Sequence, residues 1–216
     1  RSSNSRHTYS KEELKQKLEE EYDLEVNASG GKLTATAKPK NYKTINWNKA
    51  LSISFRIYVP SNANTDLATS GGSIRLQNLN GNHDFKTSGG SLHIDRLSGR
   101  IVGRTSGGSI HVAHSKDDID LATSGGSINA EDCNGTLKLK TSGGSLRLKD
   151  LGGQISARTS GGSVHGDDIK GDLLAHTSGG NVDLKGLSGS VDASTSGGGV
   201  HVELVALGKY VTISNS

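Results

Sequence analysis

Histidines recur at a fixed interval along this sequence, and they are the first side chains whose type and spacing could do chemistry. His93 and His111 are one 18-residue period apart, and Asp95 follows His93 by two positions. Two imidazoles and one carboxylate are a ligand set that binds iron in many enzymes. The equivalent places one period before and one period after this pair, however, hold Arg75 and Asn129. We therefore interpret these histidines as members of a polar row on a strand, and no metal is expected.

A second row of side chains with the same interval is basic and contains no acid. Its basic members are Lys86, Arg104, Lys140, Arg158 and His176. Like charges on neighbouring strands repel each other, so an uncompensated basic row is unfavourable without a partner. It is a candidate site for an anionic ligand such as a charged glycan or an envelope polymer. Asp84 and Asp120, two positions before members of the row, offset part of the charge, and a solvated basic stripe is the alternative.

The sequence contains none of the common catalytic or nucleotide-binding motifs. There is no nucleophile elbow, phosphate loop or dinucleotide fingerprint, and the Gly-Gly pairs precede strand patterns and not helices. We expect no catalytic residues and no cofactor. Residues 69–216 carry 14 basic and 14 acidic side chains, so nucleic acid is not an expected partner. A single cysteine, Cys133, excludes an internal disulfide, and no apolar run is long enough for a transmembrane helix.

The element that must position these rows is an 18-residue repeat. Thr-Ser-Gly-Gly begins at residues 69, 87, 105, 123, 141, 159, 177 and 195. Counting the threonine as position one, position six is always aliphatic and position eight usually is, with polar residues between them. Positions eleven, fifteen and seventeen are mostly apolar, and position thirteen is glycine in six of the eight units. This period-two alternation with glycine corners predicts a parallel β-solenoid of eight coils, one unit per coil.

The alternation also predicts where the threonines point. If positions fifteen and seventeen face inward, position one does too, because successive strand residues alternate between faces. The eight threonines are then expected to form an internal ladder of hydrogen bonds, with the two corners at the Gly-Gly pair and the position-thirteen glycine. An outward row of ice-binding threonines is not expected.

Three other architectures share some of these features. An antiparallel meander gives no reason for units of identical length. A calcium-binding β-roll needs aspartates after its glycines, whereas serine and an aliphatic residue follow here. A left-handed hexapeptide helix also has 18-residue coils, but its apolar residues recur every six positions. The spacing from Ile74 to Leu79 to Phe85 to Leu92 is five, six and seven, so this helix is the less favoured alternative.

The N-terminal third departs from the repeat. Ser10 to Glu13 is a capping box, and Leu14, Leu18 and Tyr22 form an apolar stripe, which predicts a helix from about residue 11 to 22. We expect residues 1–23 to be a tail with this helix, which covers an end or side of the sheet. Residues 24–68 are expected to be irregular opening coils, with a degenerate unit at 28–35 and a strong strand at 51–59. Residues 69–216 form the regular solenoid.

The last unit drifts from the pattern. Leu207 replaces the corner glycine, and Lys209 falls at a position that should face inward. Such irregularity is typical of terminal repeats and blunts an edge. We expect a monomer, or weak self-association through the C-terminal end.

Together these motifs resemble a known family. The strand pattern ending in Ile57-Tyr58-Val59-Pro60, the repeated Ser-Gly-Gly-aliphatic units and corners such as Leu97-Ser98-Gly99 are similar to the bacterial adhesin-like toastrack family, a domain of unknown function. The resemblance covers about residues 24–214. It implies a single-stranded, right-handed β-helix at the cell envelope, and some relatives are linked to envelope-stress sensing. The family brings no catalytic residues to this sequence.

The resulting functional hypothesis is a non-enzymatic solenoid of the cell envelope or surface, used for binding or display. One alternative is an envelope-stress or signalling module, in which the helix or the basic segment between residues 26 and 65 contacts a partner protein. The other is a polysaccharide-active β-helix enzyme. An extracytoplasmic location follows from the resemblance, and the start at Arg1 suggests a leader that precedes it.

Overall fold

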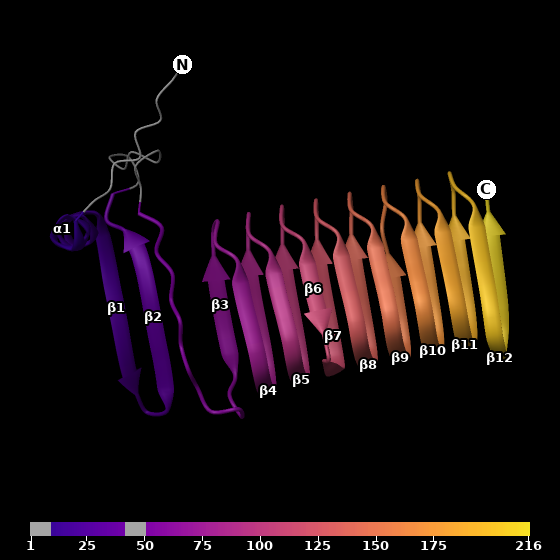
Figure 1. The fold of residues 1–216 in the computed structure, drawn as a ribbon, viewed down its shortest axis with the longest axis horizontal. Coiled ribbons are helices and arrows are strands. Elements are labelled where there is room, and N and C mark those ends of the chain that lie inside the picture. Colours follow the sequence, from indigo (N-terminus) through magenta and orange to yellow (C-terminus); the bar gives the residue numbers. More distant parts are fainter. Residues whose placement is uncertain (1–9, 42–50) are drawn as a thin grey trace, which may run out of the picture. The chain divides into compact units, whose positions relative to one another are not determined.

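The computed structural model describes residues 10–41 and 51–216. The chain divides into two compact units, residues 1–58 and residues 59–216. The first holds the single helix of the described residues and a two-stranded sheet. The second holds all the remaining strands (Figure 1).

The helix of the first unit, α1, spans Lys11–Glu21, and the capping box predicted for it is formed. The Ser10 backbone N–H donates to Glu13 Oε2 at 2.8 Å, and the Glu13 N–H donates to Ser10 Oγ at 3.2 Å. These two bonds satisfy N–H groups that a helix terminus leaves without intrahelical partners. The apolar stripe is weak, because Leu14 is 41% exposed and no residue of α1 is buried. That α1 covers the solenoid stays a prediction.

Strands β1 (Tyr22–Ser29) and β2 (Lys32–Pro39) form an antiparallel hairpin in the first unit. Its turn is Gly30-Gly31, and both residues have positive φ, of 59° and 75°. Such a two-residue turn matches the twist of an antiparallel pair. The prediction of a degenerate coil over residues 28–35 is therefore wrong. The Gly-Gly pair, which forms a coil corner in the repeats, here forms the turn of an antiparallel hairpin.

The prediction of a strand over residues 51–59 is also wrong. Residues 51–60 lie in no strand, and the first unit leaves Tyr58 86% exposed and Phe55 47% exposed. Regular pairing begins only after Pro60, where the Asn80 N–H donates to the Ser61 carbonyl at 2.7 Å. Alternating apolar residues specify which face a strand would bury, but a strand also needs a hydrogen-bonding neighbour.

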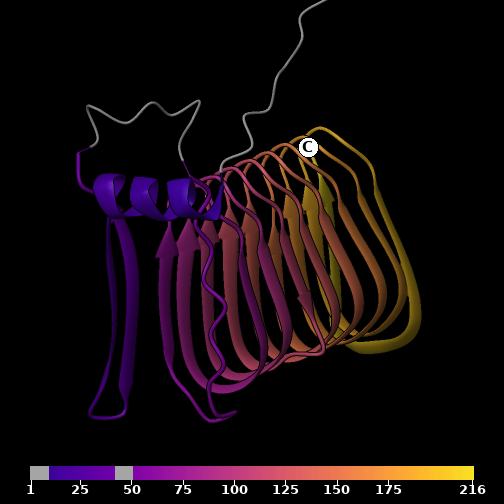
Figure 2. The same ribbon diagram turned by 60° about the vertical axis from the view of Figure 1, so that its left-hand side comes forward.

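The second unit is the predicted solenoid (Figures 1 and 2). Its strands are β3 (Thr65–Thr69), β4 (Ile74–Thr87), β5 (Leu92–Thr105), β6 (Ile110–Ala113), β7 (Lys116–Thr123), β8 (Ile128–Thr141), β9 (Leu146–Arg158), β10 (Val164–Thr177), β11 (Val182–Thr195) and β12 (Val200–Asn215). Every pair in it is parallel, and from β3 to β11 each residue lies beside the one 18 places along the chain. The coils seen obliquely in Figure 2 are therefore copies of one backbone shape.

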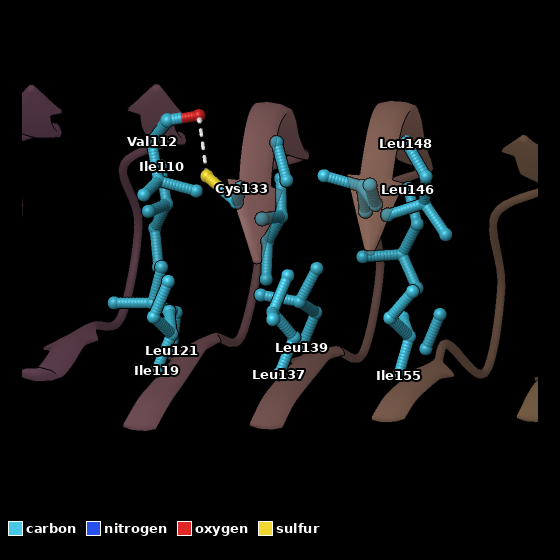
Figure 3. Packing of buried hydrophobic residues seen from close by; sticks show 14 of the residues in the cluster. Ile110, Val112, Ile119, Leu121, Cys133, Leu137, Leu139, Leu146, Leu148 and Ile155 are labelled. Carbon is cyan, nitrogen blue, oxygen red and sulfur yellow. Dashed lines mark hydrogen bonds between the residues drawn. The ribbon is translucent and has the colours of Figure 1, made fainter. Parts of the chain in front are cut away.

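The interior of the solenoid is a narrow aliphatic core (Figure 3). Side chains at positions six, eleven, fifteen and seventeen meet there, and Ile110, Leu137 and Leu146 are fully buried. Its non-aliphatic members include the buried aromatic ring of Phe85 and, two positions earlier, the imidazole of His83, which is 1% exposed. The low aromatic content of the chain, 4%, suits a core this thin.

The threonines form the predicted internal ladder. Thr141 is 1% exposed, and its Oγ1 donates to the Gly126 carbonyl of the preceding coil at 2.7 Å. The same oxygen accepts the N–H of Gly144 in its own coil at 3.2 Å. The arrangement recurs from Thr87 to Thr195. Each hydroxyl thus joins two coils and closes a corner.

The two glycines of the corner have different tasks. A Cβ on the second, as at Gly144, would overlap the carbonyl of Gly126 in the coil below, whereas a Cβ on Gly143 would meet nothing nearer than 3.4 Å. Neither has positive φ, so close stacking and not backbone conformation requires the second glycine. At the other corner the glycine of position thirteen does have positive φ, for example 127° at Gly135.

The last coil contains two extra residues. Val191 of β11 pairs with Val211 of β12, an interval of 20, after register shifts beyond Leu184. Lys209 therefore does not take the inward position expected for it. It is exposed in the bulge, where its N–H donates to Ser190 Oγ at 3.0 Å.

Candidate functional site

The basic row lies where the repeat predicts, at the eighteenth position of successive coils. Lys86 pairs with Arg104, Lys140 pairs with Arg158, and Arg158 pairs with His176 across the parallel ladder. Ala122 separates Arg104 from Lys140. The row is therefore divided into two groups of neighbours. Its use as a ligand site stays a prediction.

Two members of the row are engaged by neighbouring groups. Arg104 forms an ion pair with Asp120 at 2.8 Å, and it also donates to the Asp120 carbonyl at 2.7 Å. His176 Nδ1 lies 2.8 Å from Ser194 Oγ. Lys140 and Arg158, by contrast, are exposed and form no ion pair with any described residue. They are the adjacent charges most available to a ligand.

Sequence reasoning missed one residue of this group. Lys138 is exposed on β8, two positions before Lys140, and thus on the same face of the strand. Its partners in the ladder are Asp120 and Ser156. The carboxylate of Asp120 already forms an ion pair with Arg104. We call Lys138, Lys140 and Arg158 the basic patch. The period-two rule applied to position sixteen would have found Lys138.

The histidine row does not assemble a metal site. The rings of His93 and His111 stack with centroids 5.2 Å apart and planes 4° apart. Ring nitrogens in parallel stacked planes point side by side and do not converge on one ion. The carboxylate of Asp95 contacts other residues than His93 and His111: its Oδ1 lies 2.8 Å from His114 Nδ1, and its Oδ2 lies 2.7 Å from Arg96. Among the described residues, no three histidine, cysteine or acidic side chains are grouped to hold a metal.

The stacked pair has an electrostatic cost. Burial lowers the pKa of His93 below its ordinary value, and the neighbouring His111 and Arg75 lower it further. A second positive charge beside these neighbours would be repelled, so the protonated form of His93 is disfavoured.

The single cysteine is poorly suited to act as a nucleophile. Cys133 faces the core at a place where most coils have an aliphatic residue, and its Sγ lies 4.0 Å from the Val112 carbonyl (Figure 3). Burial raises the pKa of this thiol to about 11. The nucleophilic thiolate is therefore scarce at neutral pH.

A surface hollow is the feature that sequence reasoning did not find. It is an open trough of about 650 Å³ between the side chains of positions seven and nine, over β8 to β11. We call it the trough. One wall is formed by Asn129, Arg147, His165 and Asp183. The other wall is formed by Glu131, Lys149, Asp167 and Lys185.

The side chains of the second wall alternate in charge from coil to coil. Glu131 Oε1 lies 3.1 Å from Lys149 Nζ on the next coil, and this contact raises the pKa of the lysine. Both groups are exposed, so the pair contributes little to stability and mainly disfavours a slip by one coil.

Comparison with known proteins agrees with this architecture. The sequence profile of the toastrack family, a domain of unknown function, matches residues 2–215. The chain belongs to the toastrack family. No curated protein and no solved structure matches it.

The toastrack assignment confirms the resemblance seen in the sequence, and the parallel solenoid confirms the predicted fold. Within the described parts of this toastrack domain, no helix is long and apolar enough to cross a membrane.

Proposed function

We propose that this toastrack domain is a non-enzymatic binding and display module of the cell envelope, which holds an anionic linear polymer against its basic patch. The location outside the cytoplasm follows from the family resemblance. The observation that carries the proposal is the neighbouring pair Lys140 and Arg158, in register and without a compensating acid among the described residues. A bound anion would relieve the repulsion between them.

The geometry favours a polymer over a small ligand. Equivalent residues on adjacent coils are about 4.8 Å apart, and the residues of the patch are exposed on the outer face of the strands. A chain that runs along the solenoid axis would meet one or two positive charges on each of the coils holding Lys140 and Arg158. Binding of this kind releases counterions and weakens as the salt concentration rises. The chemical class is an anionic glycan or another polyanionic envelope polymer.

The non-enzymatic part of the proposal rests on the arrangement of the acids. Hydrolysis of a glycosidic bond uses two carboxyl groups with separate roles on either side of the bond. In the trough, Glu131 is engaged with Lys149, and elsewhere Asp120 is engaged with Arg104. Acidic and basic side chains that neutralise each other in this way suit register control better than proton transfer.

The test is a binding titration with a polyuronate of defined length, followed by calorimetry at two salt concentrations. The double variant Lys140→Gln/Arg158→Gln should weaken binding at least about fivefold and reduce its salt dependence. The matched control is Lys116→Gln/Lys170→Gln, which removes the same charge from two exposed lysines at position twelve. Equal losses in both double variants would mean that only net charge matters, and the patch would not be the site. Release of shortened uronate from the mixture would overturn the non-enzymatic assignment.

A further inference from the structure

We propose that the trough is a second binding site, on a different face from the basic patch, and that it takes a neutral linear glycan lying along the solenoid axis. This inference does not depend on the proposed role of the basic patch. It rests on the shape of the trough, on its balanced charge, and on two shielded oxygen atoms that have no hydrogen-bond partner among residues 10–41 and 51–216.

The charge of the trough excludes a simple polyanion as its best ligand. Its walls carry three acidic side chains and three basic ones, with His165 and Asn129 as the remaining polar members. Acceptors and donors thus alternate over a few ångströms. Sugar hydroxyl groups both donate and accept, so a polyhydroxylated chain can pair with either kind of side chain. A polyphosphate or a polyuronate would instead meet as much repulsion as attraction.

Two unpartnered oxygens mark the ends of one wall. Asn129 Oδ1 and Asp183 Oδ1 are both shielded from solvent, and neither accepts a hydrogen bond from any residue that the structure describes. Both residues line the trough at position seven, three coils apart. Buried polar atoms are rarely left in this state, because they lose water without gaining a partner.

The unpartnered state of Asn129 does not depend on how its amide is oriented. Its Nδ2 lies 3.1 Å from His111 Nδ1, outside the wall of the trough. If the amide were turned over, its oxygen would meet the histidine and its NH₂ would take the buried place. One polar atom of Asn129 stays without a partner among the described residues in either case. It is shielded from solvent in the free protein, so a sugar hydroxyl group meets it when the side chain turns toward the trough, and a hydroxyl can pair with either the oxygen or the NH₂.

The floor of the trough leaves recognition to these walls. It is formed by Ala130, Leu148 and Gly166, whose backbones are paired in the parallel ladder. A ligand therefore finds its polar partners at positions seven and nine only. A smaller hollow of about 300 Å³ shares Asn129 and Glu131 with the trough and extends it toward Arg75. A linear chain along the axis fits this succession better than a compact molecule does.

The experiment is a titration of the isotopically labelled protein, followed by nuclear magnetic resonance, with two neutral hexasaccharides as probes: cellohexaose and chitohexaose. We expect at least one of them to bind with millimolar affinity or better. The largest shifts should fall on residues 129–131, 147–149, 165–167 and 183–185. If neither probe shifts these signals at millimolar concentrations, or if the shifts fall elsewhere, the proposal is overturned.

The double variant Asn129→Ala/Asp183→Ala separates a binding role from a structural one. The variant removes two unpartnered oxygens and one exposed contact, that of Asn129 Nδ2 with His111. We therefore expect its melting temperature to change little, while glycan affinity falls about tenfold or more. The matched control Gln154→Ala/Asp172→Ala changes an amide and a carboxylate that are exposed at position fourteen. It should bind as the native protein does. A trough variant that melts lower and binds unchanged would show that both groups serve the fold and not a ligand.

Discussion

At the scale of single residues, the threonine hydroxyl is the group on which the stability of the stack depends most, because its one oxygen atom connects two coils. In the middle of the stack, Thr141 Oγ1 donates to Gly126 and accepts from Gly144. Valine has the same shape but neither hydrogen bond. We expect Thr141→Val to cost roughly 1–3 kcal/mol for each polar group left unpartnered. Thr141→Ser, which keeps the hydroxyl and loses a methyl group, should cost only about 1 kcal/mol.

Urea unfolding of both variants measures this difference, with Leu148→Asp as the reference for a severe core change. The Leu148 side chain is 2% exposed, so a carboxylate there should be more damaging than Thr141→Val. If the valine and serine variants unfold at the same urea concentration, the threonine ladder does not stabilise the solenoid as proposed.

His83 is the residue that should make the stability of the solenoid depend on pH. Its ring is in the core, with Nδ1 3.0 Å from Thr65 Oγ1 and Nε2 without a partner among the described residues. Burial lowers its pKa below the ordinary 6.5. The unfolded chain therefore binds a proton more readily, and the stability present above pH 6.5 is lost as the pH falls through the folded-state value.

The free energy of unfolding can fall by about 1.4 kcal/mol per pH unit through the titration of His83 alone. His83→Leu should remove this part of the pH dependence, because leucine is a normal inward residue at position fifteen. The control is His165→Leu, which replaces an exposed histidine and should leave the slope as it is. Urea midpoints between pH 7.5 and pH 5 provide the measurement. Parallel pH profiles for the native protein and His83→Leu would contradict this assignment.

At the scale of the element, the Gly-Gly corner shows how stacking and not local conformation selects a residue. A Cβ at Gly144 would overlap the backbone of the coil below, whereas a Cβ at Gly143 has room. We expect Gly144→Ala to cost at least about 2 kcal/mol through overpacking against backbone. Gly143→Ala should change stability by less than about 1 kcal/mol. Thermal unfolding of the two variants compares positions that the sequence motif makes look equivalent, and equal costs would contradict the steric explanation.

The sequence predicted those elements whose pattern is repeated and failed where a segment occurs once. Position six could be assigned to the core because all eight units agree on it, and positions eleven and fifteen because most of the units do. The Gly30-Gly31 turn has the same letters as the coil corner, and only its positive φ values and its antiparallel partners distinguish it. The positive φ at position ten, 48° at Asp132, was not predicted, because the position holds mostly aspartate, asparagine and histidine, which adopt positive φ less readily than glycine does.

The candidate sites follow the same rule. The basic row could be located because its members share one position, while Lys138 was missed because it lies alone at another. The trough depends on side-chain directions in four neighbouring coils, and pairs such as Asn129 and Asp183 are separated by three full periods of the repeat. No pattern in the sequence reveals that their oxygens lack partners.

At the scale of the whole solenoid, the C-terminal coil is the exposed end of the core. Val205, Leu207 and Ile213 are 77%, 69% and 52% exposed, and β12 has no strand on its outer side among the described residues. Such an edge is a template for further strands unless it is irregular. The two-residue bulge around Lys209 supplies that irregularity, so self-association through this end should be weak.

Deleting residues 209–216 should make the end more prone to associate. The deletion removes the partners of Val191 and Ala193 on β11 and uncovers a regular coil. We expect faster-sedimenting species and lower solubility for the truncated protein. Ile213→Lys, which adds a charge to the edge and keeps the coil, should sediment as a monomer. A truncated protein that stays monomeric and equally soluble would show that the bulge does not guard this end.

The parallel ladder has one further consequence, which concerns mechanical force. Because the hydrogen bonds between coils run along the solenoid axis, tension applied along that axis would load one coil interface at a time and peel the stack instead of shearing it. Each coil released would add at most about 60 Å of extended chain. Pulling the solenoid between its ends with optical tweezers should therefore give a series of low, evenly spaced rupture steps. A single high-force rupture would mean that the coils share the load. Peeling of this kind would let a surface-exposed solenoid lengthen under drag in small steps.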